Sequence, residues 1–438
     1  MKDTTSKAPG DPANEGDALR EGGSEPTILK QLGPGLITGA ADDDPSGIAT
    51  YSQAGAQFGF NLLWLMLLTY PLMSAIQMIS GRIGRVTGCG LAANLRTIWP
   101  RSIVLLLVGL LFVANTINIG ANLSAMGASV ELATGLPSTP ATIAFAFVSL
   151  VLQMFVPYHS YASYLKWLTM VLLSYVAVLF VVRIDWLEAG KGFVLPSLEL
   201  NGETFTVIVA ILGTTISPYL FFWQTSQEVE EIDGKDEAYP LREAPRQAKR
   251  ELKRIRIDTF AGMAISNLVA IAIIMSTAAT LHASGKTHIG TAADVAEALK
   301  PVAGNFAFAL FSIGIIGTGM LSIPVLAGSA AYAASECCGW ACSLESRPKE
   351  AMGFYSVMAI ATVLGLSIEF LPVDPIRALF WSAVINGFVA VPIMVGMMMV
   401  VSRHARMKQF TARPMLVVAG WSATAVMAAA AAAMMIYR

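Results

Sequence analysis

The stretch at residues 39–53, "GAADDDPSGIATYSQ", places three consecutive aspartates at 42–44 directly before Pro45, with long apolar segments on both sides. At the centre of a membrane helix each aspartate costs roughly 2.5–3.5 kcal/mol on insertion scales, so three in a row offset most of the gain of one apolar span. Proline removes a backbone donor and disfavours helical geometry at the preceding residue, and Gly47 adds conformational freedom. The sequence therefore predicts a helix that unwinds at this point.

Composition places the chain in a membrane. Of its 438 residues, 55% are hydrophobic and 13% are charged, and the mean hydropathy is +0.60. Soluble domains carry about 25% charged residues. We therefore expect an all-α polytopic membrane protein whose apolar segments have the length of about 20 residues that a bilayer requires. Eleven spans are expected, at 29–57, 59–81, 102–129, 140–156, 161–183, 204–226, 256–281, 303–334, 353–371, 376–401 and 413–436.

A second interruption lies in the sixth expected span, "VIVAILGTTISPYLFFWQTSQ" at 207–227, where Gly213 and two threonines precede Ser217 and Pro218. The two interrupted spans are five apart, in corresponding positions of spans 1–5 and 6–10. This pairing is typical of inverted-repeat transporters, whose binding site lies at the two breaks. Unwound backbone is tolerated at membrane depth only where it lines a cavity, and a cation can satisfy its freed carbonyl groups.

Charge along the chain predicts the domains and the orientation. Residues 1–28 are polar and are expected to form a disordered cytoplasmic tail, residues 29–402 the transporter core, and residues 403–438 a cytoplasmic loop and the eleventh helix. Basic residues concentrate in the loops after even-numbered spans, so these loops and the N-terminus are placed in the cytoplasm, most simply at a bacterial inner membrane. The basic run at 246–256 is interpreted as a topology determinant rather than a nucleic-acid site. The glutamates of "SQEVEEID", at 226–233, are expected on a solvated face.

Three stretches resemble the NRAMP metal-ion transporters: "DPSGIATYSQAGAQFGFNLLWLMLL" at 44–68, "GTTISPYLFFWQTS" at 213–226 and "GMLSIPVLAGSAAY" at 319–332. The resemblance covers nearly all of residues 29–436. It implies a leucine-transporter-type inverted repeat of spans 1–5 and 6–10 plus an eleventh helix. It also implies a metal held by the Asp and Asn of an Asp-Pro-Gly-Asn motif in span 1, by the Met of a Met-Pro-His motif in span 6, and by backbone carbonyls one turn earlier.

Carried over by position, the resemblance assigns the metal site to five residues. Asp44 matches the aspartate of the motif, Gly47 stands where the asparagine is expected, and Ser217 replaces the methionine. The backbone carbonyls of Ala41 and Thr214 complete the expected ligands. The scaffold therefore matches the family, whereas the side-chain ligands depart from it.

These departures favour a hard cation. Methionine is a soft ligand that suits transition metals, whereas carboxylate, hydroxyl, carbonyl and water oxygens suit Mg²⁺, Ca²⁺ and Mn²⁺. The change of asparagine to Gly47 also removes volume, and a roomier site suits Mg²⁺, which gives up its water reluctantly. The pattern is similar to NRAMP-related magnesium transporters. We expect a divalent cation, Mg²⁺ and/or Mn²⁺, as the transported substrate and no separate cofactor; a proton-coupled transporter of Mn²⁺ or Fe²⁺ is the alternative.

The residues that accept protons in proton-coupled NRAMP proteins are also replaced. The Asp and Glu that those proteins carry in span 3 correspond to Asn122 and Ala125, and a later histidine of span 6 corresponds to Gln224. None of these side chains titrates, so we expect uncoupled transport driven by the membrane potential, which supplies about 2.3 kcal/mol per charge per 100 mV. Asn115, Asn118 and Asn122 share one face of span 3, either for interhelical hydrogen bonds or to line the pathway.

Other polar residues near the breaks are assigned roles around the site or along the pathway. Asp42 and Asp43 are interpreted as charges beside the site or at its mouth, and they or Glu131 offer an alternative proton route. Tyr219 stands at the histidine of the Met-Pro-His motif, and Asn386 in span 10, like Gln224, is a candidate to hold metal-bound water.

Other classes of function have less support. Aromatic residues at 219–223 next to an aspartate would suit a small organic cation, and a transporter fold can also serve as a sensor. No nucleophile, base and oxyanion constellation can be assembled, so an enzyme is not expected. We expect the lipid bilayer and the metal ion as partners, with neither nucleic acid nor an obligate protein partner. The cysteines of "ECCGWACSLE", at 336–345, are interpreted as reduced structural thiols in an intracellular loop.

Overall fold

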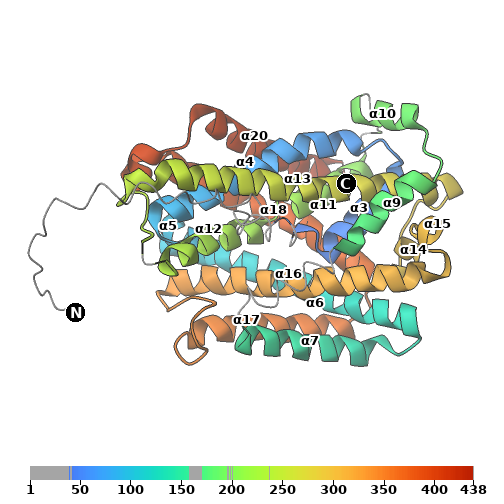
Figure 1. Ribbon diagram of the computed structural model, residues 1–438, viewed down its shortest axis with the longest axis horizontal. Coiled ribbons are helices and arrows are strands. Elements are labelled where there is room, and N and C mark those ends of the chain that lie inside the picture. The colour runs from blue at the N-terminus through green and yellow to red at the C-terminus, as the bar shows by residue number, and fades with distance from the viewer. Residues whose placement is uncertain are drawn as a thin grey trace, which may run out of the picture.

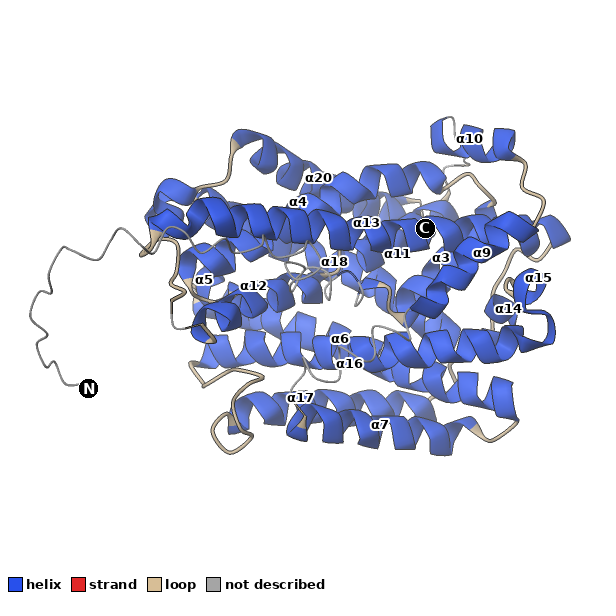
Figure 2. Cartoon of the chain, viewed as in Figure 1, coloured by secondary structure: helices blue, strands red, loops and turns tan. Residues whose placement is uncertain are grey.

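The computed structural model describes residue 39 and residues 42–156, 170–194, 197, 199, 201–235 and 237–437. Within these ranges the chain forms helices joined by turns and loops, and Figure 2 draws no strand among them. The predicted disordered tail at 1–28 lies outside the described residues. The all-α fold class is therefore confirmed for the part of the chain that the structure describes.

Nine described helices are long and apolar enough to cross a membrane, and they correspond to expected spans 2–4 and 6–11. In this count the two halves of span 6, α11 and α12, form one crossing. Expected spans 1 and 5 are only partly described, because residues 29–38, 40–41 and 157–169 lie outside the described residues. The helices are α3 (Pro45–Phe58), α4 (Leu63–Thr87), α6 (Arg101–Thr134), α7 (Ser138–Phe155), α9 (Leu173–Val181), α11 (Gly202–Thr215), α12 (Pro218–Asp233), α13 (Ala248–Thr280), α16 (Ala307–Cys338), α17 (Met352–Leu366), α18 (Pro375–Ser402) and α20 (Pro414–Ile436).

Proline opens both helices that follow the predicted breaks, and two further membrane helices. Pro45, Pro218, Pro375 and Pro414 each occupy the first turn of their helix. The missing N–H of proline is harmless there, because the first N–H groups of a helix have no partner within the helix, and the fixed φ angle already suits helical geometry. The prolines that broke the predicted spans are thus helix starts, whereas Pro71, Pro324 and Pro392 lie inside continuous helices.

Two boundaries differ from the sequence-based expectation. The seventh membrane helix, α13, begins at Ala248 rather than at 256, so most of the basic run belongs to the helix and not to a loop. Lys, Arg and Glu are good helix formers, which favours this extension. Cys337 and Cys338 lie in the last turn of α16, and only Cys342 lies in the loop that follows.

Short helices occupy several connections. They are α5 (Leu91–Leu95), α10 (Trp186–Val194), α14 (Ala292–Glu297), α15 (Lys300–Ala303) and α19 (His404–Met407). In Figure 1, α5 lies at one end of the long helices, and α10, α14 and α15 lie at the other. These ends are called here the α5 end and the α14 end.

The helices form two packed groups. In one, α3 and α4 pack against α13, and α12 packs against α4. In the other, α6 packs against α7, α16 and α17. Figure 1 shows the second group below and much of the first above it, with α18 between them. Helix α18 contacts α3 and α11 as well as α6, so it joins the groups where the two breaks lie.

Helices α11 and α18 touch through their backbones. A Cβ atom at Gly213 would lie 2.0 Å from the Ala383 carbonyl oxygen, which is too close for any side chain. Small residues allow such close approach of membrane helices, where packing rather than the hydrophobic effect drives association. This contact fixes the second break against α18.

The outward faces of the helices are apolar. Leu106 on α6, Phe147 on α7, Phe180 on α9 and Met415 on α20 are 63–87% exposed. Soluble monomers rarely expose so much apolar surface. The chain is therefore an integral membrane protein, and these faces contact lipid.

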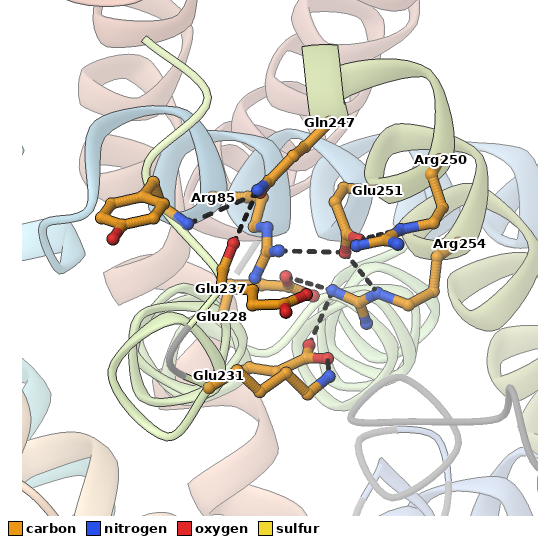
Figure 3. A network of polar contacts seen from close by, with 10 residues as sticks. Arg85, Glu228, Glu231, Glu237, Gln247, Arg250, Glu251 and Arg254 are labelled. Carbon is orange, nitrogen blue, oxygen red and sulfur yellow. Dashed lines mark hydrogen bonds and ion pairs between the residues drawn. The ribbon is translucent and has the colours of Figure 1, made fainter. Parts of the chain in front are cut away.

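A buried ion-pair network joins three helices of the first group at the α5 end (Figure 3). Arg254 of α13 contacts Glu228 at 2.6 Å and Glu231 at 2.7 Å, both on α12. Glu251 contacts Arg254 and also Arg85 of α4, each at 3.1 Å. The expectation of a solvated glutamate face is therefore wrong for Glu228, which is fully buried. Arg254 of α13 pairs with Glu228, and the sequence gives no direct sign of that pairing.

Candidate metal-binding site

Asp44 forms the first break by capping the helix that follows it. The residue has extended geometry (φ −72°, ψ 169°), and its Oδ1 accepts hydrogen bonds from the Gly47 N–H at 2.9 Å and from the Ser46 hydroxyl. Aspartate is among the preferred residues at this capping position. Two donors on Oδ1 occupy both of its lone-pair directions, so Oδ2 is the oxygen left to bind a ligand.

Helix α6 supplies the neighbours of this second oxygen. The Asn118 Nδ2 donates to Asp44 Oδ2 at 3.3 Å, and the Ser382 hydroxyl of α18 donates to Asn118 Oδ1 at 3.1 Å. Asn122, one turn further along, lies near the Asp44 carboxylate, and its Nδ2 donates to the Ser322 hydroxyl at 3.1 Å. These contacts bring together residues of α3, α6, α16 and α18.

Asn118 is a residue of the site that the sequence analysis did not select. The spacing of Asn118 from Asn122 places both on one face of α6, and this spacing is the signal in the sequence that could have identified Asn118. The third asparagine of that face, Asn115, instead donates to the Leu326 carbonyl at 2.8 Å and to Ser329 at 2.9 Å on α16. All three asparagines of this face therefore take part in interhelical hydrogen bonds.

The second break lies between Thr215, where α11 ends, and Pro218, where α12 begins. Ser217 has extended geometry, and its hydroxyl donates to the carbonyls of Gly213 at 2.9 Å and Thr214 at 2.8 Å. The Thr214 hydroxyl lies 3.4 Å from the Ser46 hydroxyl of the first break. The predicted convergence of the two breaks is thus present, with hydroxyl oxygens at the meeting point.

The space beside Gly47 is occupied. A Cβ atom built there would lie 3.3 Å from the Tyr51 ring and 3.4 Å from the Thr214 hydroxyl oxygen. A Cβ at position 47 therefore has little free space, because the Tyr51 ring and the Thr214 hydroxyl border it.

Asp42 and Asp43 contact α13 through a shared serine. The Ser266 hydroxyl lies 2.7 Å from Asp42 Oδ2 and 2.9 Å from Asp43 Oδ1. Asp42 is 0% exposed and Asp43 is 6% exposed. The two residues therefore form a separate acidic pair between the first break and α13.

The remaining predicted residues take different places. Tyr219 is buried on the first turn of α12 and lies close to Ser217. Gln224 lies further along α12 against α4, where its Nε2 would be 3.4 Å from a Cβ at Gly81. Asn386 is fully buried on α18, one turn beyond Ser382, and its amide has no hydrogen-bond partner among the described residues. Ala41 lies outside the described residues.

Soft ligands are not gathered at this site. Among the described residues no group of three or more His, Cys, Asp and Glu side chains is arranged to hold a metal. In the loop after α16, burial together with the nearby carboxylates of Glu336 and Glu230 raises the pKa of the Cys342 thiol to about 12. The thiolate is the metal-binding form, so Cys342 remains a protonated thiol near neutral pH.

The site is enclosed and its donors are oxygen atoms. Asp44, Thr214 and Ser217 are each 1% exposed, and Asn118 is fully buried. A carboxylate, hydroxyls, amides and carbonyls form the set of ligands that hard divalent cations prefer. In this conformation solvent reaches these side chains from neither end of the helices.

Comparisons with known proteins agree with this arrangement. The family model described as natural resistance-associated macrophage protein-like (Nramp) matches residues 35–437. A divalent metal cation transporter, MntH, from Deinococcus radiodurans is 27% identical over 305 residues, which cover 68% of this chain and 67% of that protein.

Solved structures share the fold. The manganese transporter of Eremococcus coleocola, crystallised with an aromatic bis-isothiourea compound, has a TM-score of 0.74 at 15% identity and covers 93% of this chain and 87% of its own. Mhp1, a nucleobase-cation-symport-1 family transporter in a closed conformation, has a TM-score of 0.54 at 13% identity and covers 93% and 92%. These likenesses confirm the expected leucine-transporter-type fold.

Proposed function

The chain belongs to the Nramp family, and we propose that it transports divalent metal cations, Mg²⁺ and/or Mn²⁺, across the membrane. The observation that carries the proposal is the environment of Asp44, a buried carboxylate with one oxygen committed to capping α3 and the other facing polar, uncharged groups. A buried carboxylate without a cationic partner is costly. A divalent cation supplies the missing charge.

The ligands favour a hard cation. The Ser46 hydroxyl donates to Asp44 Oδ1 and lies 3.4 Å from the Thr214 hydroxyl of the second break, where the Ser217 proton points back to the carbonyls of Gly213 and Thr214. A cation with right-angled bonds of 2.0–2.1 Å, as Mg²⁺ has, needs neighbouring ligands about 2.9 Å apart. The hydroxyl pair at 3.4 Å is somewhat wider, which suits a larger cation or one that keeps part of its water.

Alternating access accounts for how a cation reaches so enclosed a site. The first break belongs to α3 and the second to α11 and α12, and α3, α4, α12 and α13 pack as one group against the group around α6 and α16. Movement between these groups would open the site to one end at a time. Water bound to the cation has a candidate partner in Asn386, whose buried amide makes no hydrogen bond to the described residues.

Proton coupling is not part of the proposal. The α6 groups beside Asp44 are the amides of Asn118 and Asn122, which neither gain nor lose protons in the physiological range. The membrane potential alone provides about 4.6 kcal/mol for a divalent cation at 100 mV. Influx down the electrochemical gradient is therefore sufficient.

Flux into proteoliposomes tests the proposal. Purified protein would be offered Mg²⁺, Mn²⁺, Ca²⁺ and Fe²⁺ in turn, with a metal-sensitive and a pH-sensitive dye in the lumen. We expect Mg²⁺ or Mn²⁺ influx that an inside-negative potential accelerates, without acidification of the lumen. Absence of flux for every divalent cation would contradict the function, and metal-dependent acidification would favour the proton-coupled alternative.

A further inference from the structure

We propose that helix α6 provides ligands for the transported cation, through the side-chain amide oxygens of Asn118 and Asn122. This inference rests on the proposed function. It concerns the Asp44 site, and it adds a third ligand-bearing element to the two breaks. The amide that the Nramp resemblance leads one to expect at position 47 is absent from α3, and α6 would supply the equivalent chemistry from the opposite side.

The first observation is the position of Asn118. Its amide nitrogen lies 3.3 Å from Asp44 Oδ2, the oxygen that is not used to cap α3. A separation of 3.3 Å is long for an N–H···O bond, so replacing this hydrogen bond by a contact with a cation costs little free energy. Two cis ligands of a six-coordinate cation lie about 2.9 Å apart for Mg²⁺ and about 3.3–3.7 Å apart for Ca²⁺. A contraction of a few tenths of an ångström would thus bring this pair to the spacing for Mg²⁺.

The second observation is that Ser382 permits the amide to turn. The Ser382 hydroxyl lies 3.1 Å from Asn118 Oδ1 and 2.7 Å from the Leu379 carbonyl, yet it has a single proton. When that proton goes to Leu379, the hydroxyl oxygen can accept from Asn118. A half-turn of the amide then places Asn118 Nδ2 on Ser382 and Oδ1 beside Asp44. The two ends of an amide are nearly the same size, so the turn needs no extra space.

The third observation is the unpaired oxygen of Asn122. Its Nδ2 donates to Ser322, whereas its Oδ1 is fully buried and has no hydrogen-bond partner among the described residues. Buried acceptors of this kind are uncommon because each one costs free energy. Asn122 also lies near the Asp44 carboxylate, one helical turn from Asn118. A cation between Asp44 and α6 would satisfy the unpaired oxygen and gain a neutral ligand.

Together these contacts give each partner a defined role. Asp44 contributes charge through Oδ2, and Asn118 and Asn122 contribute neutral oxygens from one face of α6. In the cation-free state Asn118 donates to Asp44 and takes the place of the ion. In the loaded state its oxygen faces the ion, and Ser382 takes the displaced N–H group.

Substitutions at Asn118 separate a ligand from a mere hydrogen-bond donor. Asn118→Asp keeps a ligand oxygen but removes the donor, whereas Asn118→Leu removes both at similar size. Binding of Mg²⁺ and Mn²⁺ would be measured by calorimetry on purified protein in nanodiscs. We expect Asn118→Leu to weaken binding on the order of tenfold, and Asn118→Asp to bind within about threefold of wild type or more tightly.

A second pair remains informative if the aspartate variant does not fold. Asn118→Met and Asn118→Leu are both apolar and similar in size, but only methionine offers a soft ligand. We expect the ratio of Cd²⁺ to Mg²⁺ affinity to be higher for Asn118→Met than for Asn118→Leu. Asn115→Leu, one turn away on the same helix but bonded to α16, is the matched control and should leave both affinities unchanged.

Other outcomes overturn the inference. Equal losses in Asn118→Asp and Asn118→Leu, with equal ion ratios in the Met and Leu variants, would mean that Asn118 only donates to Asp44. Unchanged binding in all Asn118 variants would mean that Asn118 does not contact the ion, which contradicts the proposal. Failure of the proposed function would give a different result from failure of this inference. Wild-type protein would then bind neither Mg²⁺ nor Mn²⁺, and Asp44→Ala would cause no loss of binding.

Discussion

The two helix breaks have the same backbone design but opposite side-chain chemistry. In each, an extended residue precedes a proline that opens the next helix. At the first break, Asp44 accepts hydrogen bonds from the helix that follows, and one carboxylate oxygen remains for a ligand. At the second, the Ser217 hydroxyl donates backward to the carbonyls of Gly213 and Thr214, which end the preceding helix.

This difference indicates that the breaks contribute unequally to ion binding. The first supplies the charge, because its carboxylate is ionisable and buried among neutral groups. The second supplies geometry and neutral oxygens, and part of their hydrogen-bonding capacity is already used within the break. Substitutions at the first break should therefore have much larger effects than equivalent ones at the second.

The largest effect is expected for Asp44. Asp44→Asn keeps a side chain that caps helices well, so the protein should fold, but it removes the charge that the cation needs. We expect divalent-cation flux to fall at least about 100-fold, since loss of one buried charged partner costs about 3–5 kcal/mol. Flux into proteoliposomes and a thermal melt of the same sample would be compared. Near wild-type flux in a folded Asp44→Ala variant would mean that Asp44 does not bind the transported cation.

An intermediate effect is expected when the Nramp motif residues are restored at both breaks. The double variant Gly47→Asn with Ser217→Met adds an amide and a thioether, so selectivity should shift from Mg²⁺ toward softer ions such as Cd²⁺. Mg²⁺ flux should also fall on the order of tenfold, because a side chain at position 47 meets the Tyr51 ring. Competition between Mg²⁺ and Cd²⁺ in the flux assay measures the shift.

Gly47→Ala serves as the control for volume in that experiment. It adds a Cβ without an amide, so it should lower flux without changing the ratio of the two ions. A folded double variant with unchanged selectivity would mean that positions 47 and 217 do not face the ion.

A small effect is expected for Ser217→Ala. The substitution removes a neutral hydroxyl and leaves the proline and the extended backbone in place. Because a neutral hydrogen bond contributes only about 0.5–1.5 kcal/mol net, we expect affinity to fall on the order of threefold. Calorimetric titration of Ser217→Ala and of Asp44→Asn with Mn²⁺ compares the loss of affinity caused by a change at each break. A loss of affinity for Ser217→Ala as large as that for Asp44→Asn would contradict the unequal contribution of the two breaks to ion binding.

The smallest effect is expected from an imposed pH gradient. The amides of Asn118 and Asn122 carry no proton that could move with the metal, so initial Mg²⁺ or Mn²⁺ flux should be the same with the lumen at pH 7 and the outside one unit lower. A pH-sensitive dye reports the lumen. Metal-dependent acidification that disappears when Asp42 or Asp43 is neutralised would identify that pair as a proton route.

The fold could be predicted from sequence because its main signals are local. Apolar runs of bilayer length gave the spans, and the prolines at 45 and 218 gave both breaks. The start of α13 was missed because its first turns are charged rather than apolar, and the burial of Glu228 was missed because its partner Arg254 lies 26 residues away.

The site could be predicted only in part. Asp44, Thr214 and Ser217 follow from the breaks, and in the structure the two breaks meet where the Ser46 and Thr214 hydroxyls lie 3.4 Å apart. Asn118 was not selected because its contact with Asp44 depends on how α6 packs across the site, which helical spacing alone does not determine. The filling of the space beside Gly47 by Tyr51 depends on a side-chain conformation that sequence pattern does not specify.

Locating the bound ion tests the account most directly. Crystals of the protein with Mn²⁺ would be measured at a wavelength where manganese scatters anomalously, so that the ion is identified independently of the surrounding density. We predict one strong peak about 2.2 Å from Asp44 Oδ2, between the two breaks and within reach of α6. A peak between Asp42 and Asp43 against Ser266, with none at Asp44, would contradict it.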